Sequence, residues 1–183
     1  MYWGIYDDYT IRTYKPKSNK AILIRALEPS YKDNGCPYRV KYLNNFQAVL
    51  ELYFDDIRDA VIIDKYKDRF TLFNTDMANK LYQFVINQDF DEVIIHCNAG
   101  ISRSSALMIC FSKIINRPDL ENAIINCGRY LPNQLIIDEF NKLNIEHKDY
   151  TGTLTCTKDL SKYSNLNWDI TYHENDKISL KLI

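Results

Sequence analysis

The stretch that most constrains the fold lies between residues 91 and 116, where the sequence changes from strand-like to loop-like to helix-like. Residues 91–95, Asp-Glu-Val-Ile-Ile, are typical of a short buried strand, and apolar residues recur at helical spacing from 104 to 116. Between them, residues 96–105 read His-Cys-Asn-Ala-Gly-Ile-Ser-Arg-Ser-Ser. A strand that passes through a loop into a helix favours an α/β domain with a ligand site at the carboxyl end of that strand.

The residue types in this loop are suited to holding one phosphate group. Backbone N–H groups at the start of a helix lack partners and carry the positive end of the helix dipole, so anions bind there. Gly100 permits a tight turn in which the N–H groups of residues 98–103 point inward, and Arg103 adds a planar fork of donors. An electropositive ring of this kind favours the thiolate form of a cysteine, so Cys97 is predicted to be a nucleophile.

The pattern His-Cys-x-Ala-Gly-x-x-Arg-Ser over residues 96–104 resembles the signature of the protein tyrosine phosphatase superfamily, in the form found in small dual-specificity phosphatases. In that family the cysteine forms a phosphocysteine intermediate, the arginine holds the phosphoryl oxygens, and the following hydroxyl helps the thiolate leave. The resemblance therefore assigns catalysis to Cys97, Arg103 and Ser104. It implies that His96 supports the loop by orienting Cys97 through a hydrogen bond. It assigns phosphate binding to the loop residues Asn98, Ala99, Gly100, Ile101, Ser102 and Arg103.

Expelling an alkoxide or phenolate at neutral pH also needs a general acid, which the family supplies as an aspartate on an upstream loop. Residues 50–56, Leu-Glu-Leu-Tyr-Phe-Asp-Asp, describe a strand that ends in two acids. Placing this strand on the family pattern makes Asp56 the acid, with Asp55 beside it. Asp64 is the alternative, because it lies 33 residues before Cys97 whereas Asp56 lies 41 before it, and compact family members show the shorter separation.

A third element of the resemblance is Arg-Tyr-Leu-Pro-Asn-Gln over residues 129–134, which is similar to the Arg-x-x-x-Pro-Asn element of dual-specificity phosphatases but has two residues rather than three between the arginine and the proline. In the family this asparagine braces the phosphate loop, which assigns that role to Asn133. An asparagine before a helical pattern is also a common helix cap, so a cap for residues 135–143 is an equally supported interpretation. The two roles are compatible.

The rest of the chain predicts a central, mostly parallel, twisted sheet flanked by helices. We expect a single domain over residues 1–183, with a family-like core over about 20–145 and an extension over about 150–183 that ends in a β-hairpin. The expected strands cover residues 21–27, 47–54, 92–97, 168–173 and 177–182. Four helices are expected. The first begins near residue 74 or 75, and the other three cover residues 104–116, 118–129 and 133–144.

Composition excludes several classes of protein. A net charge of −1 does not indicate a protein that binds nucleic acid, since such proteins carry an excess of basic residues. No apolar run approaches the ~20 residues of a membrane span. The N-terminus is acidic and unlike a secretory signal. Five irregularly spaced cysteines predict neither a disulfide framework nor a zinc site, so we expect a cytoplasmic enzyme without metal or other cofactor.

The sequence thus predicts a phosphatase for phosphotyrosine and for phosphoserine or phosphothreonine in a phosphorylated protein substrate. Three alternatives stay open. The first is a phosphatase for a non-protein ester such as a phosphoinositide or an RNA 5′ end, which the uncharged side chains of the loop disfavour. The second is a sulfurtransferase or arsenate reductase, and the third is a catalytically inactive module that binds phosphoproteins.

Overall fold

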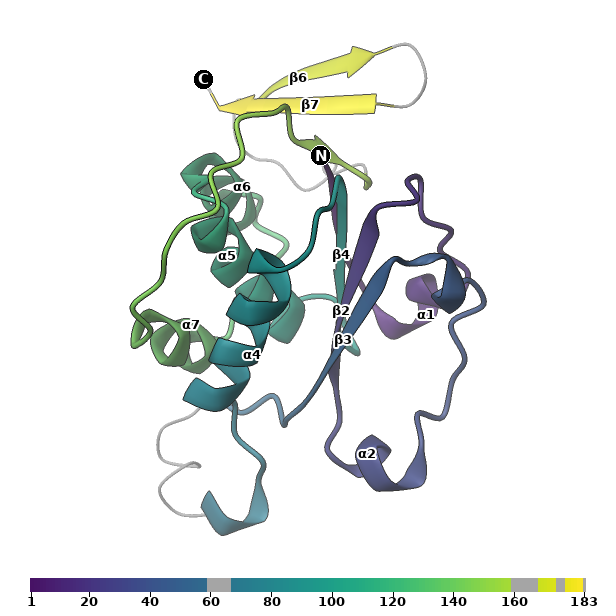
Figure 1. Cartoon of the computed structure of the whole chain (residues 1–183), viewed down its shortest axis with the longest axis vertical. Coiled ribbons are helices and arrows are strands. Elements are labelled where there is room, and N and C mark those ends of the chain that lie inside the picture. The colour runs from purple at the N-terminus through teal and green to yellow at the C-terminus, as the bar shows by residue number, and fades with distance from the viewer. Residues whose placement is uncertain (59–66, 159–167, 174–176, 183) are drawn as a thin grey trace.

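The computed structural model describes residues 1–58, 67–158, 168–173 and 177–182. Within these residues the chain forms one twisted sheet with helices on both faces (Figure 1). The predicted α/β class and parallel sheet are confirmed.

The sheet runs in the order β3-β2-β4-β1-β5-β7-β6, and its first five strands are all parallel. β7 is antiparallel to both β5 and β6. The strands are β1 (Tyr2–Tyr6), β2 (Ala21–Leu27), β3 (Ala48–Tyr53), β4 (Glu92–His96), β5 (Thr155–Cys156), β6 (Trp168–His173) and β7 (Lys177–Leu182). β2 and β4 are buried along their whole length, as expected for parallel strands covered on both faces.

Four helices cover one face of the sheet, and two short helices lie on the other face (Figure 1). The first group is α4 (Thr75–Ile86), α5 (Arg103–Ile114), α6 (Pro118–Asn126) and α7 (Gln134–Asn141); the second is α1 (Asp8–Ile11) and α2 (Ser30–Asn34). Short 3₁₀ turns lie at Leu43–Asn45 and Lys67–Arg69. α5 is the central helix of its layer, because it contacts α4, α6 and α7 as well as the sheet. Its first residues, Arg103 to Ser105, are therefore buried rather than exposed.

Local sequence explains where these helices begin. The Asn74 side chain accepts a hydrogen bond from Met77 N at 3.0 Å and caps α4. Pro118 occupies the first turn of α6, where its missing N–H costs nothing. The apolar face of α4 then packs Leu81 and Val85, both fully buried, against the sheet.

The sheet extends beyond the 20–145 range of the family resemblance, because β1 and β5 belong to it. β1 lies between β4 and β5, with Tyr6 opposite His96 in the register. The sequence analysis predicted no strand at β1 or β5, and the glycine at position 4 of β1 is locally unfavourable in a strand. The structure explains Gly4: a Cβ at this position would lie 2.1 Å from Thr157 Oγ1.

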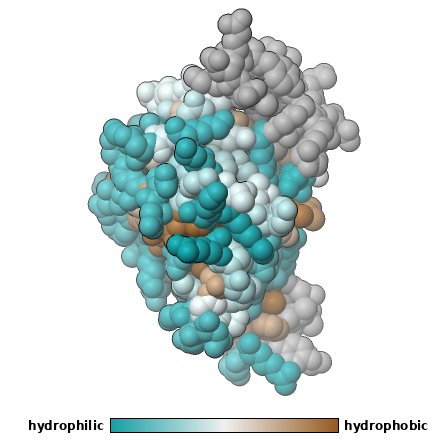
Figure 2. All heavy atoms as spheres, turned by 90° about the vertical axis from the view of Figure 1, so that its right-hand side faces the viewer, coloured by the Kyte–Doolittle hydropathy of each residue, from teal (hydrophilic) through white to brown (hydrophobic). Residues whose placement is uncertain are grey.

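The predicted C-terminal hairpin includes residues 174–176, which lie outside the described residues, as do residues 61–64 with the alternative acid Asp64. Hydrophilic side chains predominate on the face shown in Figure 2. Within the described parts of the chain, no helix has both the length and the apolar character needed to cross a membrane.

Candidate functional site

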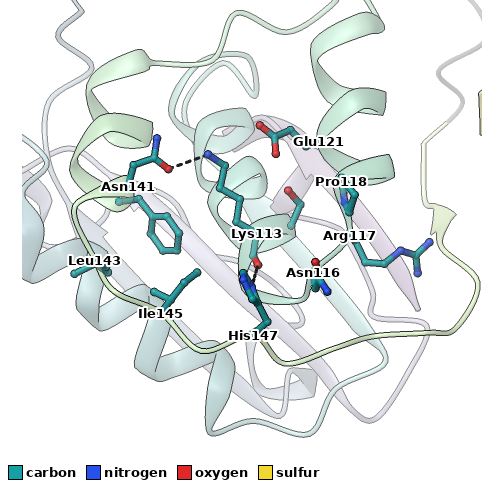
Figure 3. Close-up of a pocket in the computed structure, with 11 residues that line it drawn as sticks. Lys113, Asn116, Arg117, Pro118, Glu121, Asn141, Leu143, Ile145 and His147 are labelled. Carbon is teal, nitrogen blue, oxygen red and sulfur yellow. Dashed lines mark hydrogen bonds between the residues drawn. The ribbon is translucent and has the colours of Figure 1, made fainter.

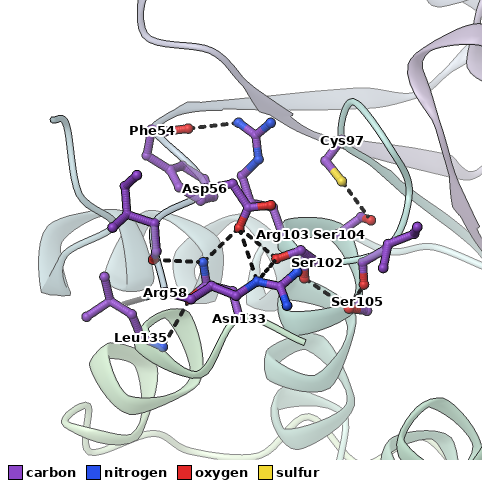
Figure 4. A network of polar contacts seen from close by, with 12 residues as sticks. Phe54, Asp56, Arg58, Cys97, Ser102, Arg103, Ser104, Ser105, Asn133 and Leu135 are labelled. Atoms are coloured by element: carbon purple, nitrogen blue, oxygen red, sulfur yellow. Dashed lines mark hydrogen bonds and ion pairs between the residues drawn. The ribbon is translucent and has the colours of Figure 1, made fainter. Parts of the chain in front are cut away.

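The candidate site is built on residues 97–102, which connect the end of β4 to the start of α5 and which, with Arg103, we call the 97–103 loop. Cys97 follows the last residue of the strand and is 2% exposed. Its Sγ lies 3.1 Å from Ser104 Oγ, in the first turn of α5 (Figure 4). The two predicted catalytic side chains are thus in contact, at the amino end of a twelve-residue helix.

The N-terminal segment of the chain holds one side of this loop. Tyr6 O accepts a hydrogen bond from Cys97 N at 3.3 Å, and Asp8 N donates to Asn98 O at 3.0 Å. Gly100 has a φ of +64°, and a Cβ there would lie 2.7 Å from the Asp7 backbone nitrogen. The loop conformation and the close approach of the first strand therefore both require glycine.

Arg103 is 3% exposed and is held by two partners outside the loop. One terminal nitrogen donates to Phe54 O at 2.9 Å (Figure 4), and the other donates to Glu28 Oε1 at 2.5 Å. Its Nε is buried and has no hydrogen-bond partner among the described residues. A buried guanidinium donor without a partner in the protein is available to an anionic ligand.

Glu28 is a site residue that the sequence analysis missed. Its Oε1 also accepts a hydrogen bond from Asn98 Nδ2 at 2.8 Å, so one carboxylate joins both ends of the loop. The signal for it was available, because Glu28 directly follows the predicted strand over 21–27. The carboxyl ends of neighbouring parallel strands meet at the same edge of a sheet, and β2 pairs with β4.

Asp56, the residue predicted to be the general acid, lies against the 97–103 loop. Its Oδ1 accepts hydrogen bonds from Ser102 Oγ at 2.6 Å and from Asn133 Nδ2 at 2.9 Å (Figure 4). Arg58 Nε lies 3.9 Å from the same oxygen and donates to Ser102 Oγ at 2.9 Å. All of these contacts involve Oδ1, and the side chain keeps about a third of its surface exposed.

Asp55 is placed differently from Asp56. Its Oδ2 accepts from Thr71 N at 2.8 Å, and its own N–H donates to Thr71 O, also at 2.8 Å. These bonds tie the strand end to residue 71 rather than to the 97–103 loop. Of the two neighbouring aspartates, Asp56 is therefore the one that contacts the loop.

Asn133 contacts both α7 and the 97–103 loop. Its Oδ1 accepts from Leu135 N at 3.1 Å and caps α7, and its backbone N–H donates to Ser102 O at 3.4 Å. Its Nδ2 also donates to Ile57 O at 3.1 Å, beside the bond to Asp56. Asn133 thus links α7 with both the 97–103 loop and the segment that carries Asp56.

His96 has a partner that the sequence did not indicate. Its Nε2 accepts a hydrogen bond from the buried Arg25 Nε at 3.1 Å, while Nδ1 has no partner among the described residues. Burial, and then the positive charges of Arg25 and Arg103, lower the pKa of His96 from 6.5 to about 3. The ring is therefore neutral near pH 7 and adds no positive charge beneath Cys97.

The remaining loop residues differ in accessibility: Ala99 is exposed, Ile101 half-buried and Ser102 buried. Within the described residues, no group of three or more His, Cys, Asp or Glu side chains is arranged to hold a metal ion. The five cysteines are all unpaired.

A separate cavity of about 270 Å³ lies at the other end of α5 (Figure 3). Lys113, Asn141 and His147 are among its lining residues. Their polar atoms bind one another: Lys113 Nζ donates to Asn141 Oδ1 at 2.8 Å, and His147 Nδ1 lies 2.8 Å from Lys113 O. The cavity is distinct from the 97–103 loop, which lies at the amino end of the same helix.

No family model matches the chain, and no curated protein matches its sequence.

Proposed function

We propose that this protein is a cysteine-dependent phosphatase that hydrolyses phosphotyrosine, and also phosphoserine or phosphothreonine, in a phosphorylated protein. The main support for the proposal is the environment of the Arg103 side chain. Its guanidinium is buried and fixed by Glu28 and Phe54, yet its Nε has no partner among the described residues, in the loop that contains Cys97. A fixed donor with unmet hydrogen-bonding capacity suits a phosphoryl oxygen.

The proposed reaction has two steps. In the first, the Cys97 thiolate attacks phosphorus, the ester P–O bond breaks, and Asp56 gives its proton to the leaving oxygen. In the second, water attacks the phosphocysteine, Asp56 takes a proton from that water, and the S–P bond breaks to return the thiolate. Ser104 Oγ, 3.1 Å from Cys97 Sγ, donates a hydrogen bond to the departing sulfur.

The position of Asp56 supports its part in both steps. Ser102 and Asn133 bind Oδ1, so Oδ2 is the oxygen available to carry the transferred proton. Because Ser102 belongs to the 97–103 loop, the acid is tied to the same structure that would hold the phosphoryl group. Positioning of this kind removes much of the entropic cost of proton transfer.

Carboxylates around the loop weigh against polyanionic substrates. Glu28 and Asp56 contact the loop directly, and Asp7 lies beside Gly100. Burial alone would raise the pKa of Asp7, but hydrogen bonds from Thr10 and the charge of Lys158 outweigh burial and lower it. A phosphoinositide or a 5′-triphosphate would place extra negative charge near these groups, whereas a single phosphoester would not.

The presence of Cys97, Arg103 and Asp56 together also weighs against an inactive binding module. We further propose that the protein works in the cytoplasm, where reducing conditions keep the Cys97 thiol reactive.

The decisive experiment is phosphate release from matched phosphotyrosine, phosphoserine and phosphothreonine peptides in the presence of EDTA. We expect turnover by the wild type, none by Cys97→Ser, and nearly normal turnover by the control Cys127→Ala, which removes a thiol elsewhere. Retained peptide binding without any wild-type turnover would overturn the proposal in favour of a phosphopeptide-binding module.

A further inference from the structure

Within residues 1–58 and 68–158, large apolar side chains are exposed at only a few places: Tyr9, Val49, Ile125 and Leu131. Isolated exposed apolar residues are normal on protein surfaces and need no explanation. Two of these four, however, lie on backbone segments that are hydrogen-bonded to the 97–103 loop. Their common position calls for a functional explanation.

Tyr9 belongs to the segment that holds the first part of the loop. Its neighbour Asp8 donates a backbone hydrogen bond to Asn98 O at 3.0 Å, and Asp7 packs against Gly100. Tyr9 itself is 78% exposed. The packing of α1 therefore leaves an aromatic ring in solvent one residue away from a direct contact with the loop.

Leu131 belongs to the segment that holds the last part of the loop. Its own N–H donates to Ile101 O at 3.2 Å, and its side chain is 62% exposed. Leu131 and Asp8, the neighbour of Tyr9, are thus joined through backbone bonds to loop residues on either side of Gly100. We call the side chains of Tyr9 and Leu131 the apolar rim.

The loop is polar whereas the rim is apolar, and this difference indicates which kind of group is esterified to the phosphate in the substrate. The phosphate group needs only the polar donors of the loop, and apolar side chains add affinity only where the group attached to the phosphate is itself apolar. A phosphotyrosine ring buries a large apolar surface and pairs favourably with an aromatic side chain. The single methylene of phosphoserine leaves the rim unused.

The geometry points to Tyr9 and Leu131 as the residues that make this site prefer phosphotyrosine over phosphoserine. The inference rests on the proposed function for the identity of the phosphate site. It goes beyond that function by naming the side chains that select the substrate.

The test measures binding and not turnover. In the Cys97→Ser background, dissociation constants are measured for two peptides that differ only in carrying phosphotyrosine or phosphoserine. Tyr9→Ala and Leu131→Ala should each weaken phosphotyrosine binding by about three- to tenfold, because each removes one aromatic or apolar contact. Each should weaken phosphoserine binding by less than about twofold. Tyr9→Phe should keep the preference, because it keeps the ring.

Ile125→Ala is the matched control, because Ile125 is also an exposed apolar side chain, 53% accessible, but lies on α6. It should change neither constant. Equal weakening of both peptides by the rim variants, no weakening of either, or no binding of the phosphotyrosine peptide by Cys97→Ser would overturn the inference. A further contrary result concerns vesicles that contain a monophosphorylated phosphoinositide. If the rim variants bound these vesicles less tightly but bound both peptides normally, the rim would contact lipid and the inference would be overturned.

The turnover assay on the wild type separates this inference from the proposed function. An enzyme that hydrolyses phosphotyrosine while the rim variants keep the wild-type preference would leave the proposed function intact and remove only the role of the rim.

Discussion

The Glu28 carboxylate binds the Arg103 guanidinium with an N···O distance of 2.5 Å, and Glu28 comes from the end of β2, 75 residues before Arg103. Arg103 is nearly inaccessible, while Glu28 keeps about a quarter of its surface exposed. The same carboxylate oxygen binds Asn98. The orientation of the guanidinium therefore depends on a residue outside the 97–103 loop.

We predict that Glu28→Ala lowers kcat/KM by about 10- to 100-fold, because the loss of one hydrogen bond to a charged group changes a free energy by an amount of that order. It should also destabilise the protein, because Arg103 stays buried with one partner fewer. Glu28→Gln keeps an acceptor oxygen and should cost about threefold to tenfold. Steady-state kinetics and inhibition by inorganic phosphate measure both effects.

Glu139→Ala is the matched control for Glu28. Glu139 also accepts from a cation and a polar side chain, Lys142 and Thr75, but it lies on α7 away from the 97–103 loop. Its removal should leave kcat/KM within about twofold. A Glu28→Ala enzyme with wild-type phosphate inhibition would show that Arg103 is positioned without Glu28.

The two adjacent aspartates should behave very differently. Asp56→Asn keeps an oxygen for Ser102 and Asn133 but cannot donate the carboxyl proton, so kcat at neutral pH should fall by about 10²- to 10⁴-fold. Asp55→Asn, which affects only the contacts with Thr71, should cost less than about threefold. The loss in Asp56→Asn should shrink with an aryl phosphate whose leaving group needs no proton.

The kinetics of Asp64→Asn decide the alternative that the sequence left open. A severe loss in Asp64→Asn together with a nearly normal Asp56→Asn would transfer the role of general acid to Asp64.

What the sequence could predict depended on how far apart the interacting residues are in the chain. Cys97, Gly100 and Arg103 lie within seven residues, so their spacing alone indicated a ring around one anion. The α/β class followed from strand and helix periodicities, which are also local. The contact of Asp56 with Ser102 spans 46 positions and was approached only through the family pattern.

The missed features all depend on non-local pairing. Arg25 within an apolar strand gave no sign that it binds His96, because that contact exists only once β2 and β4 are adjacent. The place of β1 beside β4 was hidden for the same reason. Glycine in a short strand is locally unfavourable, and only the tertiary contact with Thr157 makes Gly4 necessary.

The lowered pKa of His96 predicts an acid-sensitive contribution to stability. Burial, Arg25 and Arg103 lower the pKa from 6.5 to about 3 in the folded state, so the unfolded chain takes up this proton first as the pH falls. The contribution of the neutral ring is complete above about pH 6.5 and is lost progressively between there and about pH 3. One proton corresponds to a slope of about 1.4 kcal/mol per pH unit.

Urea unfolding of the wild type and of His96→Asn between pH 7 and pH 4 measures this contribution. The variant should be less stable at pH 7, because Arg25 loses the imidazole acceptor, but its free energy of unfolding should fall less steeply with acid. Parallel pH profiles for the two proteins would mean that His96 does not supply the acid-sensitive term.

Alanine substitutions at Gly100 and Gly35, which both have positive φ, distinguish the cost of backbone strain from the cost of a steric clash. Gly100, at +64°, has the backbone of Tyr6 and Asp7 within 2.8 Å of an added Cβ, whereas Gly35, at +77°, has no atom within 4 Å. Gly35→Ala should therefore cost about 1 kcal/mol of unfolding free energy from strain alone. Gly100→Ala must also push β1 away from the loop, so it should cost about 2–4 kcal/mol and abolish turnover. Denaturant midpoints compare the two variants, and equal destabilisation would contradict the close packing of the N-terminal segment against Gly100.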